Sequence, residues 1–437
     1  MRYNLKKPVL VLAIALAVVI EVRANTVSGT VTTGEYPCAI AIDSVTNKIY
    51  VANQGAYGST STVTVIDGAT NSTTTVTVGT YPSAIAVNPM TNRIYVANYL
   101  SQDVTVINGA TDLTAAVVSV GSEPDAVVVN PVTNRIYVTN EGITGSSSVT
   151  VINGTSDSVA ALSVGEEPSA IAVNTVTNKI YVADAVSNNV TVIDGATNAT
   201  STVSAGSSDA LALNSITNKI YVTNYASNTV TIIDGATDST TTVNVGSYPD
   251  AITINPATNK IYVVNVVSNN ITLIDGATDS TTTIGVGYYP YAAAMNPVTN
   301  KIYVTNFNGG DITVIDGATN TITTDSAGTN PEVIAVNSLT DNIYVGNNGS
   351  NNVTVFNGTP TAVKLIAHKF QTSSIGYNGV LAVYSLNGRR ILRTLFTSSS
   401  TKESILRVIN KIPAKGLYKY CLFKECKVMD EGNFVVK

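Results

Sequence analysis

Two positions that recur about every 40 residues carry aromatic or acidic side chains that could bind a ligand. One lies in Val-Gly-x-Tyr/Glu-Pro segments, and the other follows the Asn or Asp that ends Ile-Tyr-Val-x-Asn segments. Aromatic rings stack on sugar faces or protein side chains, and carboxylates accept hydrogen bonds. Together they favour neutral glycans, cations or basic partners over phosphates. The candidate binding residues are Tyr36, Tyr57, Tyr81, Tyr99, Glu123, Glu141, Glu167, Tyr225, Tyr248, Tyr289, Tyr291 and Phe307.

The same segments contain further carboxylates and no Lys or Arg. This charge pattern again disfavours an anionic ligand. The additional residues are Asp125, Glu166, Asp184, Asp209, Asp250, Glu332 and the aromatic Tyr288.

Chemistry that relies on histidine or tryptophan has little support, because the 437 residues contain one histidine, His368, and no tryptophan. This argues against a haem with a histidine ligand, a multi-histidine zinc or copper centre, and catalysis by a histidine dyad. A calcium site of the D-x-[DN]-x-[DN]-G type is also missing from the sequence. We therefore expect no catalytic residue, no metal and no cofactor.

The charge of the chain changes sharply after residue 360. Residues 25–360 hold 24 acidic and seven basic residues, a net charge of −17, whereas residues 361–437 have a net charge of +9. This shift, beside Thr359-Pro360-Thr361, marks a domain boundary. A body as acidic as 25–360 is not expected to bind nucleic acid.

One unit repeats eight times between residues 27 and 358. Its anchors are Asn-Lys/Arg-Ile-Tyr and Asp/Asn-Gly, and a period of 40–45 residues without a helical pattern is typical of β-propeller blades. Each unit divides into four short strands, expected in the sixth copy at 251–254, 260–264, 270–274 and 281–286. The anchor tyrosines, expected to pack between adjacent sheets, are Tyr50, Tyr95, Tyr137, Tyr181, Tyr221, Tyr262, Tyr303 and Tyr344.

The two ends of the repeat region complement each other. The chain enters at 27–33, which matches a fourth strand, and leaves after 352–356, which matches a third strand. Pairing them completes the last blade and leaves no open sheet edge at the seam. The sequence therefore predicts an all-β, eight-bladed propeller of four-stranded blades, with seven blades as the alternative.

Three copies of the unit contain Tyr-Val-Thr-Asn, at Tyr137, Tyr221 and Tyr303, and the other copies vary it. Residues 25–360 thus resemble the YVTN family of β-propeller repeats, which is found in bacterial and archaeal surface proteins. The resemblance covers about three quarters of the chain. It implies a propeller that is displayed at a cell surface.

Loop lengths distinguish the two faces of the expected ring. The loop after the YVTN segment has five residues in six copies, but the first and third copies carry the longer segments 54–62 and 141–148. This loop shares a face with the Val-Gly-x-Tyr/Glu-Pro link, and we call that face the loop face. Insertions clustered on one face mark a binding face.

The basic residues of the repeat region occupy one turn on the opposite face. There we expect them to form a ring and to pair with nearby Asp residues. They are Lys48, Arg93, Arg135, Lys179, Lys219, Lys260 and Lys301.

Residues 1–24 have the pattern of a secretory signal peptide. Lys6 and Lys7 precede the apolar run 9–20, and Val22-Arg23-Ala24 offers small residues for cleavage. The run is shorter than the ~20 residues of a membrane span, and a retained signal anchor is the alternative. We expect the mature protein to be secreted or held at the outer cell surface, and not to be an integral membrane protein.

Residues 361–437 are expected to form a small β-sandwich-like domain. A hairpin with its turn at Asn387-Gly388 is followed by a Gly416-Leu417-Tyr418 strand and a terminal strand ending at Lys437. This spacing resembles the C-terminal sorting domain of type IX secretion. The resemblance implies contact with that secretion machinery and passage across an outer membrane, and a small domain that binds another ligand is the alternative.

Cys421 and Cys426 are candidates for a disulfide. If Phe423-Lys424 forms a two-residue hairpin loop, the two cysteines face each other, and an exported protein meets an oxidising compartment. Disulfides between directly opposed residues of neighbouring strands are strained, so a disulfide and a pair of free thiols are both alternatives for these cysteines.

The combined pattern favours a secreted or cell-surface, non-catalytic propeller that binds a glycan or a protein partner through the loop face. A propeller lactonase or hydrolase is the first alternative. A lactonase site would require His or Arg near the central pocket of the propeller. The arginines of the repeat region, Arg93 and Arg135, are expected on the opposite face. The second alternative is a structural surface-coat component whose loop face contacts copies of itself.

Overall fold

The computed structural model describes residues 26–143 and 145–357, together with C-terminal strands at 379–385, 390–396, 416–424 and 427–436. The chain divides into two compact units, with the boundary between Pro360 and Thr361. The signal sequence expected at 1–24 lies outside the described residues.

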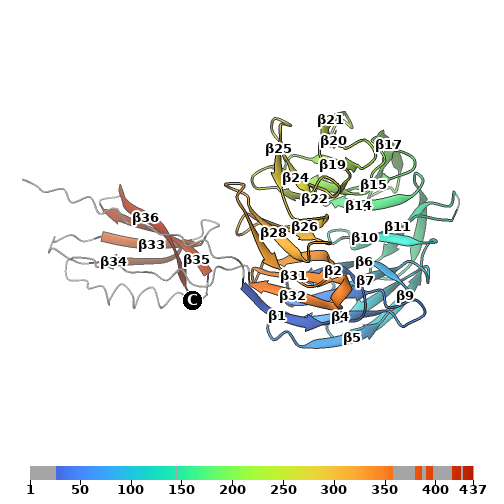
Figure 1. Ribbon diagram of the computed structural model, residues 1–437, viewed down its shortest axis with the longest axis horizontal. Helices are drawn as coiled ribbons and strands as arrows, with labels where there is room; N and C mark the ends of the chain where they lie inside the picture. The colour runs from blue at the N-terminus through green and yellow to red at the C-terminus, as the bar shows by residue number, and fades with distance from the viewer. Residues whose placement is uncertain are drawn as a thin grey trace, which may run out of the picture. The chain divides into compact units, whose positions relative to one another are not determined.

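Eight antiparallel sheets of four strands make up the first unit and stand in a ring like the blades of a propeller (Figure 1). First strands of neighbouring blades contact each other around the ring, so they form its inner wall. Fourth strands such as β5, β9 and β21 lie at the periphery (Figure 1). The eight-bladed propeller predicted from the repeats is confirmed, and the seven-bladed alternative is wrong.

Each strand position has similar bounds in all blades, and the strands of the sixth copy begin and end within two residues of the predicted ones. The first strands are β2 (Pro37–Asp43), β6 (Pro82–Asn88), β10 (Pro124–Asn130), β14 (Pro168–Asn174), β18 (Leu211–Asn214), β22 (Pro249–Asn255), β26 (Pro290–Asn296) and β30 (Pro331–Asn337). The second strands are β3 (Lys48–Asn53), β7 (Arg93–Asn98), β11 (Arg135–Asn140), β15 (Lys179–Asp184), β19 (Lys219–Asn224), β23 (Lys260–Asn265), β27 (Lys301–Asn306) and β31 (Asn342–Asn347). The third strands are β4 (Thr62–Asp67), β8 (Asp103–Asn108), β12 (Ser148–Asn153), β16 (Asn189–Asp194), β20 (Thr229–Asp234), β24 (Asn270–Asp275), β28 (Asp311–Asp316) and β32 (Asn352–Asn357). The fourth strands are β5 (Thr73–Thr77), β9 (Leu113–Ser119), β13 (Val159–Ser163), β17 (Thr200–Ser204), β21 (Thr240–Asn244), β25 (Thr281–Gly285), β29 (Ile322–Ser326) and β1 (Thr26–Thr32), and a short 3-10 helix, η1 (Asn348–Ser350), follows β31.

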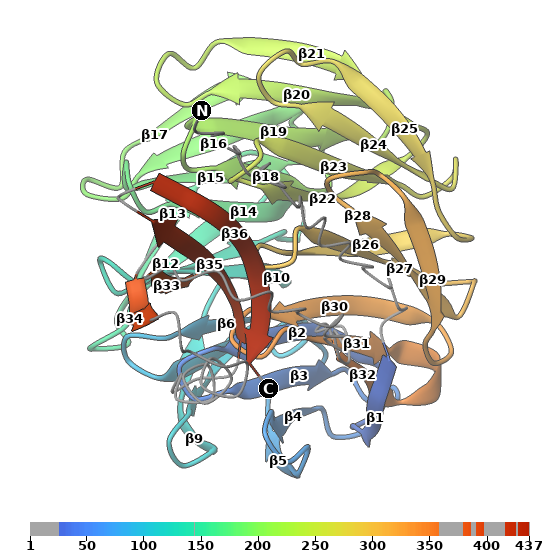
Figure 2. The same ribbon diagram turned by 90° about the vertical axis from the view of Figure 1, so that its left-hand side faces the viewer.

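The ring closes through the N-terminal strand. β1 pairs antiparallel with β32, with Thr30 opposite Thr354 and Val31 opposite Val353. It lies along the outer edge of the eighth blade in both views (Figures 1 and 2). The predicted closure by residues near 27–33 is therefore confirmed, and β1 covers an edge that would otherwise present unpaired backbone groups.

Hydrophobic side chains fill the space between adjacent blades. Each interface contains an anchor tyrosine packed against aliphatic residues of the next blade, as Tyr50 packs against Ile94 and Val96. All eight anchor tyrosines are fully buried, so the predicted packing role is confirmed. The blades are held in the ring by apolar contacts between neighbouring sheets, which bury large side chains from water.

A buried amide ends the second strand of seven blades. In the second blade, Asn98 Nδ2 donates a 2.9 Å hydrogen bond to Thr105 Oγ1, and the same pair recurs in six other blades. The glycine of the preceding link packs tightly on this amide, because a Cβ on Gly121 would lie 2.7 Å from Asn140 Cγ. This packing fixes the start of the link that carries the candidate binding residues.

Asp184 replaces the amide in the fourth blade. Thr191 Oγ1 donates a 2.7 Å hydrogen bond to its Oδ2 atom, and Oδ1 has no hydrogen-bond partner. The residue is fully buried, and desolvation raises the pKa of its carboxyl to about 6. Its ionised form is therefore unfavourable in the folded state.

We expect Asp184→Asn to stabilise the protein at pH 8 by about 1–3 kcal/mol, because the variant restores the amide–hydroxyl pair and removes a buried charge. Because the folded pKa is raised, the stability gained should shrink as the pH falls through about 6. Urea unfolding at pH 8 and pH 5 measures both effects. Asn265→Asp is the matched reverse change and should destabilise, and a destabilised Asp184→Asn protein would contradict this account.

Five of the seven basic residues form the expected ion pairs with Asp on the face opposite the loop face. Lys48 Nζ lies 2.7 Å from Asp112 Oδ1, and Arg93 Nη1 lies 2.8 Å from Asp157 Oδ1; both pairs join one blade to the next. Arg135 instead donates to Asn198 Oδ1 of the next blade at 3.1 Å. The other ion pairs are Lys179–Asp238, Lys219–Asp279 and Lys260–Asp275.

The described part of the C-terminal unit is one antiparallel sheet in the order β34-β33-β35-β36. The predicted hairpin is present as β33 (Gly379–Ser385) and β34 (Arg390–Phe396), and its turn lies outside the described residues. β35 (Gly416–Lys424) pairs with β36 (Lys427–Val436), with Lys424 opposite Lys427.

The hairpin loop expected at Phe423-Lys424 is wrong, because both residues belong to β35 and are paired with β36. Cys421 lies opposite Glu431 in this register. Cys426 lies outside the described residues, so the disulfide stays a prediction.

Candidate binding face

Backbone hydrogen bonds join the link before each blade to the loop between its second and third strands. Tyr99 N donates to Tyr81 O at 2.8 Å, and Phe307 N donates to Tyr289 O at 2.8 Å. The long loop of the first blade is held in the same way, with Gln54 N donating to Tyr36 O at 3.0 Å. Link and loop therefore share the loop face, as the sequence predicted.

The candidate residues in the links adopt an unusual backbone conformation. Tyr36, Tyr81 and Tyr289 have φ angles of 56°, 60° and 57°, and Glu123, Glu167 and Tyr248 are also left-handed. This region favours Gly and Asn, and each of these residues also precedes a proline, which restricts its backbone further. Asn330 occupies the same position in the last link. The turn therefore gives no reason for large aromatic or acidic side chains at these positions.

Five of the predicted residues gather near the two long loops, and we call them the acidic cluster: Tyr81, Tyr99, Glu123, Glu141 and Glu167. The rings of Tyr81 and Tyr99 are 6.4 Å apart, and Tyr99 Oη donates a 2.9 Å hydrogen bond to Glu141 Oε2. Desolvation and the charges of Glu123 and Glu167 raise the pKa of Glu141, and its bond from Tyr99 opposes the rise.

Five others gather on the fifth to seventh blades, and we call them the aromatic arc: Tyr225, Tyr248, Tyr289, Tyr291 and Phe307. Ring centroids are 5.4 Å apart for Tyr225 and Tyr248, 6.2 Å for Tyr289 and Phe307, and 5.8 Å for Tyr291 and Phe307. Tyr248, Tyr289 and Tyr291 remain 44%, 37% and 36% exposed. The arc offers several accessible rings side by side.

Tyr36 and Tyr57 belong to neither group. Tyr36 is partly exposed in the link to the first blade, and no ring contact joins it to another described aromatic residue. Tyr57 is 98% exposed in the loop between β3 and β4. Ten of the twelve candidate residues therefore belong to two separate groups on the loop face, and Tyr36 and Tyr57 lie outside both.

The residue that follows the proline of each link, or its equivalent in the fifth blade, lies at or beside the start of a first strand, and the first strands form the inner wall of the ring. In three blades it is Cys or Ser and donates to a carbonyl of the next blade, as Ser83 Oγ donates to Pro124 O at 2.7 Å. In four others it is a carboxylate, which cannot donate such a bond when ionised. We call these the central carboxylates: Asp125, Asp209, Asp250 and Glu332.

Burial in the ring shifts the titration of the central carboxylates. Desolvation raises the pKa of Asp125 and of Glu332 to about 7 and that of Asp209 to about 6, and it also raises the pKa of Asp250. Neighbouring charges add to the rise: those of Glu141 and Asp209 raise the pKa of Asp125, and that of Asp250 raises the pKa of Asp209. No hydrogen bond or ion pair to these carboxyl groups occurs among the described residues.

Sequence reasoning placed the central carboxylates on the loop face without singling them out. The signal was present, because each occupies the position just after the proline of a link, or its equivalent at Asp209. Aligning that one position across the eight copies would have identified a common ring.

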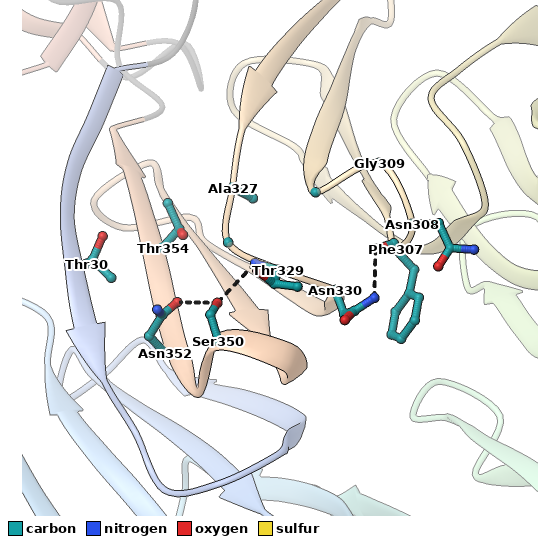
Figure 3. A pocket seen from close by; sticks show the side chains of 12 residues that line it. Thr30, Phe307, Asn308, Gly309, Ala327, Thr329, Asn330, Ser350, Asn352 and Thr354 are labelled. Carbon is teal, nitrogen blue, oxygen red and sulfur yellow. Dashed lines mark hydrogen bonds between the residues drawn. The ribbon is translucent and has the colours of Figure 1, made fainter.

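An uncharged groove of about 550 Å³ lies between the seventh and eighth blades (Figure 3). It is lined mainly by small or polar residues, and Phe307 belongs to both the groove and the aromatic arc. Ser350 Oγ accepts a 3.0 Å hydrogen bond from Thr329 N, and Asn330 Nδ2 donates to Phe307 O at 3.3 Å. Amide, hydroxyl and backbone groups with one ring suit a neutral, hydroxyl-rich ligand.

Within the described ranges, no group of three or more His, Cys, Asp or Glu side chains is arranged to hold a metal ion. The described residues also include no helix with the length and apolarity needed to span a membrane.

Comparisons with known proteins show the fold and no family. No protein-family model matches the chain, and no curated protein matches it. The chain is similar to solved structures of Kuenenia stuttgartiensis hydrazine synthase (18% identity, TM-score 0.53, 76% of this chain and 99% of that chain). It is also similar to Saccharomyces cerevisiae Sqt1 (11% identity, TM-score 0.64, 76% of this chain and 98% of that chain). Both support the β-propeller architecture alone.

Proposed function

We propose that this protein is a secreted or cell-surface, non-catalytic β-propeller that binds a glycan or a protein partner through its loop face. The observation that carries the proposal is the set of exposed aromatic side chains at left-handed link positions, where the backbone favours smaller residues. Exposed aromatic side chains with polar groups around them are typical of an interaction site. The uncharged groove adjoins the aromatic arc at Phe307.

Secretion is proposed on the sequence features of the two chain ends. The apolar run 9–20 with its preceding lysines supports export, and the resemblance of the C-terminal region to type IX sorting domains supports release or attachment at the outer surface.

Shortening 54–62 and 141–148 to the five-residue length of the other six copies should leave the melting temperature within a few degrees of wild type. The other six blades fold with a five-residue loop, so a longer loop is not required for folding. Halving the length of a loop changes the entropic free energy of closing it by only about 0.6 kcal/mol. Partner binding should fall, and Tyr57→Ala alone should reproduce part of the loss. A glycan array that also includes candidate proteins, followed by affinity measurement on each variant, tests this.

Lys179→Ala, on the opposite face, is the control for the loop variants and should bind normally. Binding would lie on the opposite face if a partner's affinity were unchanged in the loop and aromatic variants but reduced in Lys179→Ala. Lattice formation that rises with protein concentration would instead favour the surface-coat alternative.

A hydrolase is the second candidate, favoured by one observation. Carboxyl groups with pKa values near 7, such as those of Asp125 and Glu332, have the property required of a general acid. Turnover of lactones or glycosides that is lost in Asp125→Asn or Glu332→Gln would establish that alternative over simple binding.

A further inference from the structure

We propose that the aromatic arc and the central carboxylates together bind lysine or arginine side chains presented by an exposed segment of a partner protein. The inference rests on the proposed binding function of the loop face and names the chemistry that this face recognises.

The first argument is the charge of the face. Every basic residue of 25–360 begins a second strand on the opposite face, and five of the seven are in ion pairs with Asp residues there. Nothing basic in the repeat region therefore neutralises the loop face. The resulting field attracts a cationic partner and repels an anionic one.

The second argument is the state of the central carboxylates. They are half-buried and have no hydrogen-bond or ion-pair partner among the described residues, while three other blades use the same position for a structural bond. Partial desolvation without a partner is unfavourable for a carboxylate. A ligand ammonium or guanidinium group would supply the missing opposite charge.

The third argument is the position of the rings. Tyr248 is close enough to Asp209 and Asp250 for their charges to raise the pKa of its phenol, and Tyr291 is influenced in the same way by Glu332 and Asp250. Tyr291 also takes the place of a central carboxylate in the seventh blade, because its strand, β26, contacts both β22, which carries Asp250, and β30, which carries Glu332. Cations bind ring faces, and a carboxylate nearby strengthens the attraction. Aromatic and acidic groups in this combination suit an organic cation better than a neutral sugar.

The full-length protein can be tested with a fluorescein-labelled (Gly-Lys)4 peptide, its fully acetylated form and (Gly-Glu)4, by anisotropy at pH 8 and 0.15 M salt. We expect the lysine peptide to bind at least tenfold more tightly than the acetylated peptide, and the glutamate peptide not to bind. An arginine version, (Gly-Arg)4, should bind at least as tightly as the lysine peptide, because guanidinium groups also stack on rings.

Single variants locate the site. Asp250→Asn should weaken lysine-peptide binding about tenfold, and Tyr248→Leu should weaken it about three- to tenfold. Glu166→Gln removes the same charge from an exposed position of the loop face outside the arc and should change affinity less than twofold. Asp250→Asn preserves side-chain shape and removes an unpaired charge, so its folding is not at risk.

Three outcomes would overturn the inference: no lysine-peptide binding, equal binding of the acetylated peptide, or equal losses in Asp250→Asn and Glu166→Gln, which would indicate diffuse attraction. The proposed binding function can be tested independently of this cation chemistry. If a partner from the array depends on Tyr57 or Phe307 but not on Asp250, the loop face still binds and only its cation chemistry is wrong.

Discussion

Deletion of residues 26–34 is expected to lower the melting temperature by more than 10 °C and to cause aggregation. The deletion removes β1, the fourth strand of the eighth blade, and exposes the edge of β32. It also removes Val31, which is packed with Val353 and Val355 in the interface between the eighth and first blades. Loss of a strand and of buried side chains together should cost several kcal/mol, on the order of two large-to-small core substitutions.

The effect can be attributed to strand pairing by two further measurements. A synthetic peptide of residues 26–34, added in excess, should restore part of the melting temperature by strand addition. Val31→Ala in the intact chain should destabilise by only about 1–3 kcal/mol, because the backbone pairing of β1 survives. An unchanged melting curve after the deletion would show that the ring does not depend on this closure.

The melting temperature is expected to rise as the pH falls from 8 to about 5. The folded pKa values of Asp125, Glu332 and Asp209 are about 7, 7 and 6, whereas these carboxyls titrate near 4 in an unfolded chain. Between these values the folded state binds more protons than the unfolded state, so stability increases as the pH decreases. Glu141 and Asp250 also have raised pKa values and act in the same direction.

Below about pH 4 the trend should reverse. Backbone N–H groups of the turns lower the pKa values of Asp67, Asp194 and Asp234, and a lowered folded pKa contributes stability that is lost as those groups protonate. Calorimetry from pH 8 to pH 3 should therefore show a maximum between about pH 4 and pH 5. The double variant Asp125→Asn/Glu332→Gln should be more stable than wild type at pH 8 and should flatten the rise. A wild-type melting temperature that falls steadily from pH 8 to pH 5 would contradict the assignment.

Much of the propeller could be predicted from local patterns. The anchor tyrosine marks the second strand in every copy of the repeat. The last copy lacks a fourth strand, and the N-terminal end of the repeat region supplies one. These features are local because each blade is a meander of consecutive strands. The turn residues and the alternation of apolar and polar residues that define a blade therefore lie within one short segment of sequence. The same locality placed the long loops and the prolyl links on one face.

The turn of the C-terminal hairpin could not be predicted from the local sequence. The sequence around Cys421 and Cys426 is strand-forming on both sides, and nothing in it fixes a two-residue turn at Phe423-Lys424. The observed register, with Lys424 opposite Lys427, depends on pairing along the whole of β35 and β36.

By itself, the sequence determined the number of blades, their strands, the closure by residues near 27–33 and the face on which the candidate residues lie. Only the tertiary structure decided that Tyr225 packs against Tyr248 and that Tyr289 and Tyr291 both pack against Phe307. It also decided that Tyr99 bonds to Glu141. It also placed the central carboxylates of different blades within electrostatic reach of one another, Asp125 with Asp209 and Asp209 with Asp250. The physical reason is that ring closure, and not sequence spacing, sets the distance between equivalent positions, so residues about 40 to 200 positions apart meet around one axis.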